Sequence, residues 1–208
     1  MRDPRPAPPY AGYDVLDKWS SVSFDDLTRD VVKRRLEDVP ERRFFTEQEF
    51  RTLEAVCARL LATAPGRPPI ASAIDADLFH GRGEGFRSPE MPPLPALWRL
   101  GLAGLDGEAA RRHGKRFAAL DGARQDATLR ALQRGEVDTA LFDPVPAPVF
   151  FTQVLLKAAA AHFYSRPEAW SEIGFGGPAS PRGYVRMDLD RRDPWEAPLR
   201  SRRRARSR

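Results

Sequence analysis

The sequence predicts an all-α protein, and three observations lead to that prediction. Apolar residues recur at every third or fourth position in six separate segments, and residues that cap helices stand at the ends of several of them. No stretch keeps the strict alternation of a half-buried strand. We therefore expect a single helical domain, with an extended N-terminal arm and an irregular C-terminal segment rich in aromatic residues, glycine and proline.

The 208 residues divide by composition into four parts. Residues 1–43 form an arm with one short helix, residues 44–165 a helical core domain, residues 166–199 an irregular contact segment and residues 200–208 a disordered Arg-rich tail. The chain has 20 prolines and 15 glycines, more than average but fewer than low-complexity chains contain. We therefore expect it to fold, with long connections.

The arm contains one predicted amphipathic helix. Ser23 is the expected N-cap, and Asp25 and Asp26 follow it where acids favour the positive end of the helix dipole. The helix should end before Pro40. Its expected apolar face consists of Leu27, Val31, Val32 and Leu36.

The clearest helix start is the capping box formed by Thr46 and Glu49. The following apolar positions share one face: Phe50, Leu53, Cys57, Leu60 and Leu61. Cys57 is the only cysteine, so the chain cannot form an intramolecular disulfide. Its place on an apolar face predicts a core residue and not a reactive thiol.

Two further helices are separated by a glycine-rich loop. The first repeats an apolar residue every fourth position, at Ile70, Ile74 and Leu78, and should end at Gly81. The loop glycines at 81, 83 and 85 follow no predicted strand, so they do not form a dinucleotide fingerprint. The next helix should run to about His113, with an inner face made of Leu94, Leu97, Trp98, Leu102 and Leu105.

The last two predicted helices also have clear boundary residues. Asp121 is the expected N-cap of the fifth, Gly135 its C-terminal cap, and Leu129 and Leu132 should point inward. Pro148 can occupy the first turn of the sixth, the expected central helix. Its dense apolar stripe consists of Phe150, Phe151, Val154, Leu155, Ala158, Ala161 and His162.

The segment from residue 166 to residue 199 shows neither helical nor strand periodicity. Large aromatic residues on irregular backbone are typical of a docking surface, although such a segment can also fold back over the chain's own helices. We predict a partner-binding segment, with the contact residues Trp170, Ile173, Phe175, Gly176, Gly177, Pro178, Tyr184 and Trp195.

The sequence lacks a recognisable catalytic or metal-binding pattern. The three histidines, His80, His113 and His162, are too scattered for a local metal motif, and no HExxH, CxxC pair, P-loop or GxSxG is present. We therefore predict no catalytic, cofactor-binding or metal-binding residue. An acidic cluster, Asp188, Asp190 and Asp193, leaves a standalone enzyme as an alternative. The interleaved arginines Arg186, Arg191 and Arg192 favour a mixed-charge turn instead.

The basic charge of the chain is local. The net charge is +5, but residues 200–208 hold six arginines, and the remaining residues include 28 basic and 29 acidic ones. The body therefore lacks the basic face of a specific nucleic-acid-binding domain, and only the tail leaves a nucleic-acid-binding module as an alternative. Since no apolar run is long enough to span a membrane and no signal peptide is recognisable, we expect a cytoplasmic chain without a membrane span.

Three stretches, in this order, resemble the gluconate 2-dehydrogenase subunit 3 family over residues 44–178: FFTEQEFRTLEAVCARLL, GLAGLDGEAARRHGKRFAALDGARQDATLRALQRGE and FFTQVLLKAAAAHFYSRPEAWSEIGFGGP. The resemblance implies a small accessory subunit of a membrane-associated dehydrogenase complex. In such complexes FAD and the catalytic histidine belong to a large flavoprotein subunit of the glucose-methanol-choline class, and a cytochrome c subunit often accepts the electrons.

The sequence also differs from many members of the family that it resembles, and the difference concerns the export signal. Many members carry a twin-arginine export signal, which is not recognisable in this sequence. The chain should then stay in the cytoplasm, or reach the periplasm by co-export with a partner that supplies the signal.

Overall fold

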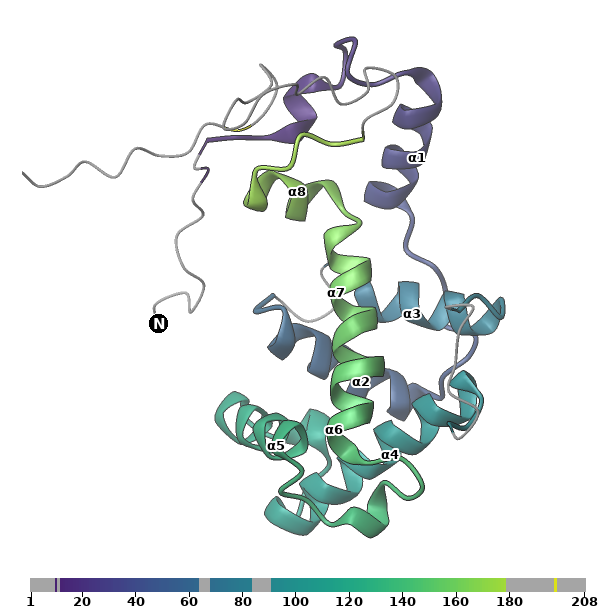
Figure 1. Cartoon of the computed structure of the whole chain (residues 1–208), viewed down its shortest axis with the longest axis vertical. Helices are drawn as coiled ribbons and strands as arrows, with labels where there is room; N and C mark the ends of the chain where they lie inside the picture. The colour runs from purple at the N-terminus through teal and green to yellow at the C-terminus, as the bar shows by residue number, and fades with distance from the viewer. Residues whose placement is uncertain (1–9, 11, 64–67, 84–90, 179–196, 198–208) are drawn as a thin grey trace, which may run out of the picture. The chain divides into compact units, whose positions relative to one another are not determined.

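The structure is a computed structural model that describes residues 10, 12–63, 68–83, 91–178 and 197. Helices are the only regular structure in these residues, so the all-α prediction is confirmed (Figure 1). Contacts divide the chain into two compact units: a central unit, residues 39–163, and a terminal unit, residues 1–38 together with residues 164–208. The sequence suggested a separate arm and contact segment, whereas the structure groups the described parts of both chain ends in one unit.

The central unit is built around one long helix, which Figure 1 shows running through α6, η4 and α7. α4 and α5 pack against each other and against η4, while α2 packs against α3, α4 and α5. The elements in chain order are α2 (Glu47–Leu60), α3 (Ile70–Phe79), α4 (Leu94–His113), η2 (Phe117–Ala119), α5 (Gly122–Arg134), η3 (Thr139–Leu141), α6 (Ala147–Val149), the π-helix η4 (Phe150–Leu156) and α7 (Lys157–Tyr164).

Local capping signals set several of these boundaries, as predicted. Thr46 and Glu49 form both hydrogen bonds of the capping box at the start of α2. The Asp121 side chain accepts the N–H of Arg124 at the start of α5. Gly114 and Gly135 end α4 and α5 in the left-handed conformation that favours glycine.

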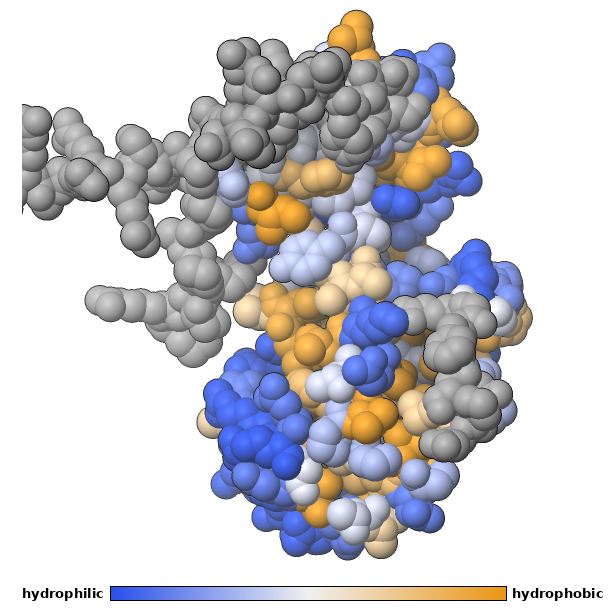
Figure 2. All heavy atoms as spheres, viewed as in Figure 1, coloured by the Kyte–Doolittle hydropathy of each residue, from blue (hydrophilic) through white to orange (hydrophobic). Residues whose placement is uncertain are grey.

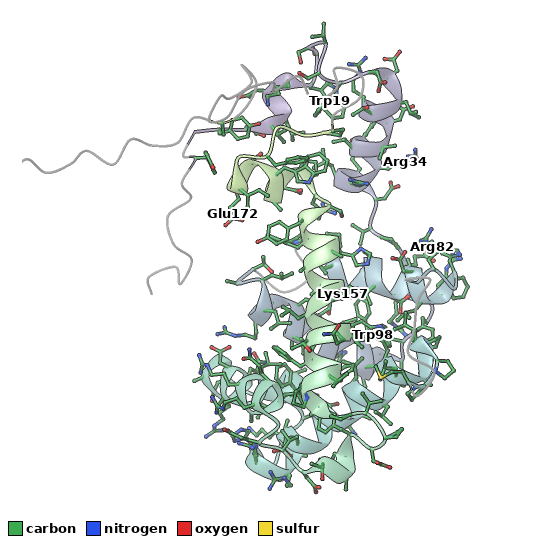
Figure 3. The ribbon with its side chains drawn as sticks, viewed as in Figure 1. Trp19, Arg34, Arg82, Trp98, Lys157 and Glu172 are labelled. Atoms are coloured by element: carbon green, nitrogen blue, oxygen red, sulfur yellow. The ribbon has the colours of Figure 1, made fainter. Side chains whose placement is uncertain are left out.

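A chain of aromatic rings forms the middle of the core. Trp98 of α4, labelled in Figure 3, meets Phe45 on one side and Phe150 of η4 on the other, each edge-to-face with centroids 6.0 Å apart. All three side chains are buried. Cys57 lies in the same core with 5% of its surface exposed, as predicted, and burial raises the pKa of its thiol to about 12.

The central helix departs from the prediction of a uniform α-helix, because η4 is a π-helix. The four predicted stripe residues within it, Phe150, Phe151, Val154 and Leu155, are buried as expected, but Ala161 is exposed and Ala159 is buried instead. A π-turn holds more residues than an α-turn, so it rotates the positions that follow it. The predicted stripe was therefore wrong at Ala161.

Buried carboxylates fix two connections of the central unit. Asp75 of α3 is fully buried and accepts the backbone N–H groups of Arg43, Phe44 and Phe45, just before α2 begins. Glu108 of α4 accepts hydrogen bonds from the Arg111 and Arg112 side chains and from the Asp138 N–H. These donors satisfy two carboxylates that burial would otherwise leave without hydrogen bonds.

The terminal unit contains the helices η1 (Val15–Lys18), α1 (Asp26–Glu37) and α8 (Pro167–Ile173). Its small core consists of Val15, Phe24, Val32 and Trp170. The helix α8 corrects the prediction that residues 166–199 are irregular from the beginning. Seven residues are too few to show helical periodicity in the sequence, but Pro167 opens the helix and Gly174 closes it.

The prediction for α1 needs two corrections. Asp25, and not Ser23, is the N-cap, because the Asp25 side chain accepts the N–H of Thr28 at 2.7 Å. Leu27 is 71% exposed and lies off the buried face, which contains Thr28 and Val32 four residues apart. The apolar spacing alone did not distinguish Leu27 from Thr28 as the inward position.

Candidate protein-binding surface

The predicted contact residues fall into two groups in the terminal unit. Trp170 is buried, with 4% of its surface exposed, and its indole Nε1 donates a hydrogen bond of 2.7 Å to the Tyr164 carbonyl. The Arg35 guanidinium lies 5.9 Å from the centre of its ring. Trp170 therefore stabilises the chain's own fold, which was the alternative interpretation of this segment.

Ile173 and Phe175, in contrast, present apolar surface to solvent. Ile173 at the end of α8 is 46% exposed and Phe175 is 37% exposed. The Phe175 ring packs edge-to-face on Trp170, with centroids 5.7 Å apart. Phe175 is thus held on one side by the core and open on the other, the environment of an anchor that a partner can cover.

The glycines between and after these residues shape the backbone. Gly174 has φ +72°, and a Cβ there would lie 2.7 Å from the Tyr10 ring. Gly177 has φ +83°, and its Cβ would approach Phe24 to 3.1 Å. Gly176 and Gly177 are buried and Pro178 is half-buried, so these three residues support the surface without forming its exposed part.

Three acidic side chains lie on α8 or next to it. Glu168 and Glu172 lie on α8 together with Ile173, and Figure 3 labels Glu172 on this helix. Asp14 precedes η1, within 3.1 Å of the Ser171 hydroxyl. We call Ile173 and Phe175 with the three acids Asp14, Glu168 and Glu172 the α8 surface. Figure 2 shows apolar and hydrophilic side chains next to each other over α8.

N-terminal residues hold the α8 surface, which the sequence did not predict. Tyr13 donates a hydrogen bond from its hydroxyl to the Phe175 carbonyl at 3.2 Å, and the Val15 N–H donates to Ser171 Oγ at 3.1 Å. These partners are 162 and 156 positions apart. No periodicity or motif of a single sequence signals such a distant pairing.

Several predicted residues lie outside the described part of the chain. These are the contact residues Tyr184 and Trp195, the acidic cluster of Asp188, Asp190 and Asp193 with its neighbouring arginines, and the tail of residues 200–208. The contact roles of all eight predicted residues remain predictions.

The histidines are dispersed in the structure as in the sequence. His162 Nε2 lies 3.3 Å from Asp77 Oδ2, and Arg82 also binds Asp77, at 2.9 Å. Burial lowers the pKa of His162, and Arg82 adds to this effect, while Asp77 opposes it. His113 lies 3.4 Å from the Thr128 hydroxyl. Among the described residues, no group of three or more His, Cys, Asp or Glu side chains could hold a metal ion.

Comparisons with known proteins match the chain to a protein family. A family model described as gluconate 2-dehydrogenase subunit 3 matches residues 47–177, more than half of the chain. No curated protein matches, and no solved structure matches. Within the described residues, no helix has the length and apolar character needed to cross a membrane.

Proposed function

The chain belongs to the gluconate 2-dehydrogenase subunit 3 family, and from that premise we propose that it is a non-catalytic accessory subunit that binds and stabilises a flavin-dependent dehydrogenase. The family is named for one subunit of a multi-subunit dehydrogenase, and the match over residues 47–177 is the observation that carries the proposal. The substrate of the complex is a sugar or polyol.

The proposed division of labour places the chemistry in the partner. The large subunit is a flavoprotein of the glucose-methanol-choline class that holds FAD, and a cytochrome c subunit takes up the electrons. Two buried carboxylates of this chain fit an accessory role, because both have structural partners: Asp75 binds three backbone N–H groups and Glu108 binds two arginines. These two carboxylates hold the scaffold together.

The α8 surface is the proposed contact with the flavoprotein. Ile173 and Phe175 are exposed apolar side chains on a backbone that turns at Gly174 and is held by the Tyr13 hydroxyl. Large apolar residues that are ordered before binding contribute much of the affinity of an interface, since little conformational entropy is lost when a partner covers them.

The first test is an affinity purification of the full chain from its own cells, followed by mass spectrometry and a visible absorption spectrum. We expect a stoichiometric protein of the glucose-methanol-choline class with the absorption bands of a flavin. Isolation of the chain without a flavoprotein would contradict the proposed function.

Paired surface variants then test the contact. We expect the double substitution Ile173→Ser and Phe175→Ser to weaken binding of the purified flavoprotein about tenfold or more, because it removes apolar surface that the partner buries. Leu27→Ser is the matched control, since Leu27 is also an exposed apolar residue of the terminal unit, on α1. Deleting all residues after Tyr164 is a poorer test, because it also removes Trp170 from the core.

Equal affinities of the double variant and the Leu27→Ser control would exclude the α8 surface as the contact. The accessory-subunit proposal would survive that result.

A further inference from the structure

We propose that the N-terminal segment of residues 13–24 positions the α8 surface, and that the surface so formed fits an apolar recess edged by Lys and Arg side chains on the flavoprotein subunit. The inference rests on the proposed function, since it concerns the same contact. It goes beyond the family match, because that match begins at residue 47 and leaves the N-terminal segment out.

Ser171 is the first link between the two chain ends. Its hydroxyl oxygen accepts the Val15 N–H at 3.1 Å. The hydroxyl also lies 3.1 Å from Asp14 Oδ1 and 3.1 Å from the Pro167 carbonyl, one of which accepts its single proton. Ser171 therefore joins the start of η1 to the middle of α8, two residues before the exposed Ile173.

Tyr13 is the second link, and it acts on the backbone of Phe175. The Tyr13 hydroxyl donates to the Phe175 carbonyl at 3.2 Å and accepts a hydrogen bond of 2.7 Å from Lys18 Nζ. The Lys18 ammonium also lies 4.9 Å from the centre of the Tyr13 ring. The carbonyl position of Phe175 is thereby fixed from the N-terminal segment, while its ring is fixed by Trp170.

Apolar packing also holds the backbone behind the α8 surface. Val15 and Phe24 belong to the core of the terminal unit together with Trp170. Both approach Gly177 so closely that a Cβ there would lie 3.3 Å from Val15 and 3.1 Å from Phe24. The segment that carries Phe175 thus lies between the N-terminal residues and Trp170 and has little freedom to move.

The charged side chains near the α8 surface indicate which charge the partner's surface should carry. Glu168 has 53% of its side chain exposed, Asp14 is exposed and Glu172 is half-buried. Two cations also lie near the surface, and both have partners. Arg166 is 9% exposed and binds Glu168 at 3.2 Å, and Lys18 donates to the Tyr13 hydroxyl at 2.7 Å, so the three acids outnumber these two cations. An apolar centre with an acidic edge is complementary to an apolar recess with a basic edge.

The experiment measures the dissociation constant of full-length variants for the flavoprotein that co-purifies with the chain, by titration calorimetry. We expect Ser171→Ala and Tyr13→Phe each to raise the dissociation constant about fivefold, the effect of one lost hydrogen bond. Ser171→Thr keeps the hydroxyl and should retain the wild-type affinity. Neither Ser171 nor Tyr13 needs to contact the partner for this result.

Two further measurements separate positioning from other effects. Hydrogen exchange of residues 171–178 should become faster in Ser171→Ala and Tyr13→Phe, while exchange in α2 to α5 stays unchanged. Glu172→Lys should weaken binding about fivefold or more at low salt, and the loss should shrink as salt rises, because the proposed contact with basic side chains is screened.

The outcomes distinguish the two proposals. A wild-type chain that binds no flavoprotein contradicts the proposed function itself. Wild-type affinity in Ser171→Ala and Tyr13→Phe, together with weakened binding in the Ile173→Ser and Phe175→Ser variant, overturns the positioning role and leaves the proposed function intact. Wild-type affinity in Glu172→Lys would contradict the proposal that Lys and Arg side chains edge the recess on the flavoprotein. If Ser171→Ala does not fold, Tyr13→Phe decides, since it removes a hydrogen bond at the exposed edge of the unit.

Discussion

Glu108 is the residue whose ionisation contributes most clearly to stability. It is fully buried in α4 and receives the Arg111 guanidinium in a bidentate pair, through contacts of 2.7 and 2.9 Å. Burial alone would raise the pKa of Glu108, but hydrogen bonds from Arg111, Arg112 and the Asp138 N–H outweigh it and lower the pKa from 4.5 to about 2. The folded protein therefore favours the charged carboxylate.

The direction of this shift predicts how stability depends on pH. The contribution is fully present above pH 4.5, the unfolded pKa, and is lost as the pH falls toward 2, the folded pKa. We expect Glu108→Gln to lower the free energy of unfolding by about 2–3 kcal/mol at pH 7 and by clearly less at pH 3. Urea denaturation at both values measures the difference.

Glu136→Gln is the matched control for Glu108→Gln. Glu136 is also paired with an arginine, Arg134, but its side chain is 56% exposed. Water screens this ion pair, so the substitution should change stability little at either pH. Equal losses in the two variants would show that the burial of Glu108 does not strengthen its ion pairs.

Some single residues could be predicted from the sequence because their signals are local. Thr46 and Glu49 form the capping box that their spacing predicts, and Cys57 is buried as its place in the apolar stripe indicates. Leu27 was misplaced, since Thr28 took the inward position beside Val32. In the contact segment, Ile173 and Phe175 are exposed, whereas burial of Trp170 depends on partners far away in the chain.

At the scale of elements, α4 has glycines where it meets η4 and η3. A Cβ on Gly101 would lie 2.2 Å from the Phe150 ring, and one on Gly104 would lie 2.7 Å from the Leu141 carbonyl. Because Gly101 and Gly104 have no side chains, the Phe150 ring of η4 and the backbone of η3 can approach the axis of α4 closely. Close packing is thus obtained at the cost of helix propensity in α4.

This packing predicts opposite effects for two glycines of α4. Gly101→Ala should lower the free energy of unfolding by about 1–3 kcal/mol, because the overlap with Phe150 exceeds the gain in helix propensity. Gly107→Ala should be neutral or stabilising by up to ~1 kcal/mol, since its Cβ would meet only the flexible Leu141 side chain, at 3.2 Å. Urea denaturation of both variants gives the comparison, and equal stabilities would contradict the role of Gly101.

The helices of the central unit were predictable, but not the π-helix within the last of them. Asp121 and Gly135 mark α5 by their own preferences for helix ends, which operate within a few residues. The π-helix η4 has no such signal. It lies where the Phe150 ring reaches Gly101 on α4, a contact between residues 49 positions apart that only the folded core creates.

At the scale of the whole molecule, the sequence did not reveal that the two chain ends share a unit. The arm and the contact segment each contain too few apolar residues for a core of their own. Val15, Phe24 and Val32 of the first complete their burial with Trp170 of the second. Composition shows that each segment differs from the central helices, but it does not show that the two meet.

The division into two units predicts that they can lose structure separately. We expect Trp170→Ala to destabilise the terminal unit by about 3–5 kcal/mol, a large fraction of what so small a core can supply. Hydrogen exchange should then become fast in α1 and α8 of the full chain, whereas α2, α4 and α5 should keep the slow exchange of the wild type.

Trp98→Ala provides the reciprocal experiment, because Trp98 is equally buried but belongs to the core of the central unit. It should accelerate exchange in α2, α4 and α5. If either substitution accelerates exchange uniformly through all helices, the chain unfolds as one cooperative body and the α8 surface is as stable as the central core. If exchange changes only in the unit that carries the substitution, the stability of the α8 surface depends on the contacts of the N-terminal segment with Trp170 and Phe175. The proposed partner contact then depends on residues at both ends of the chain.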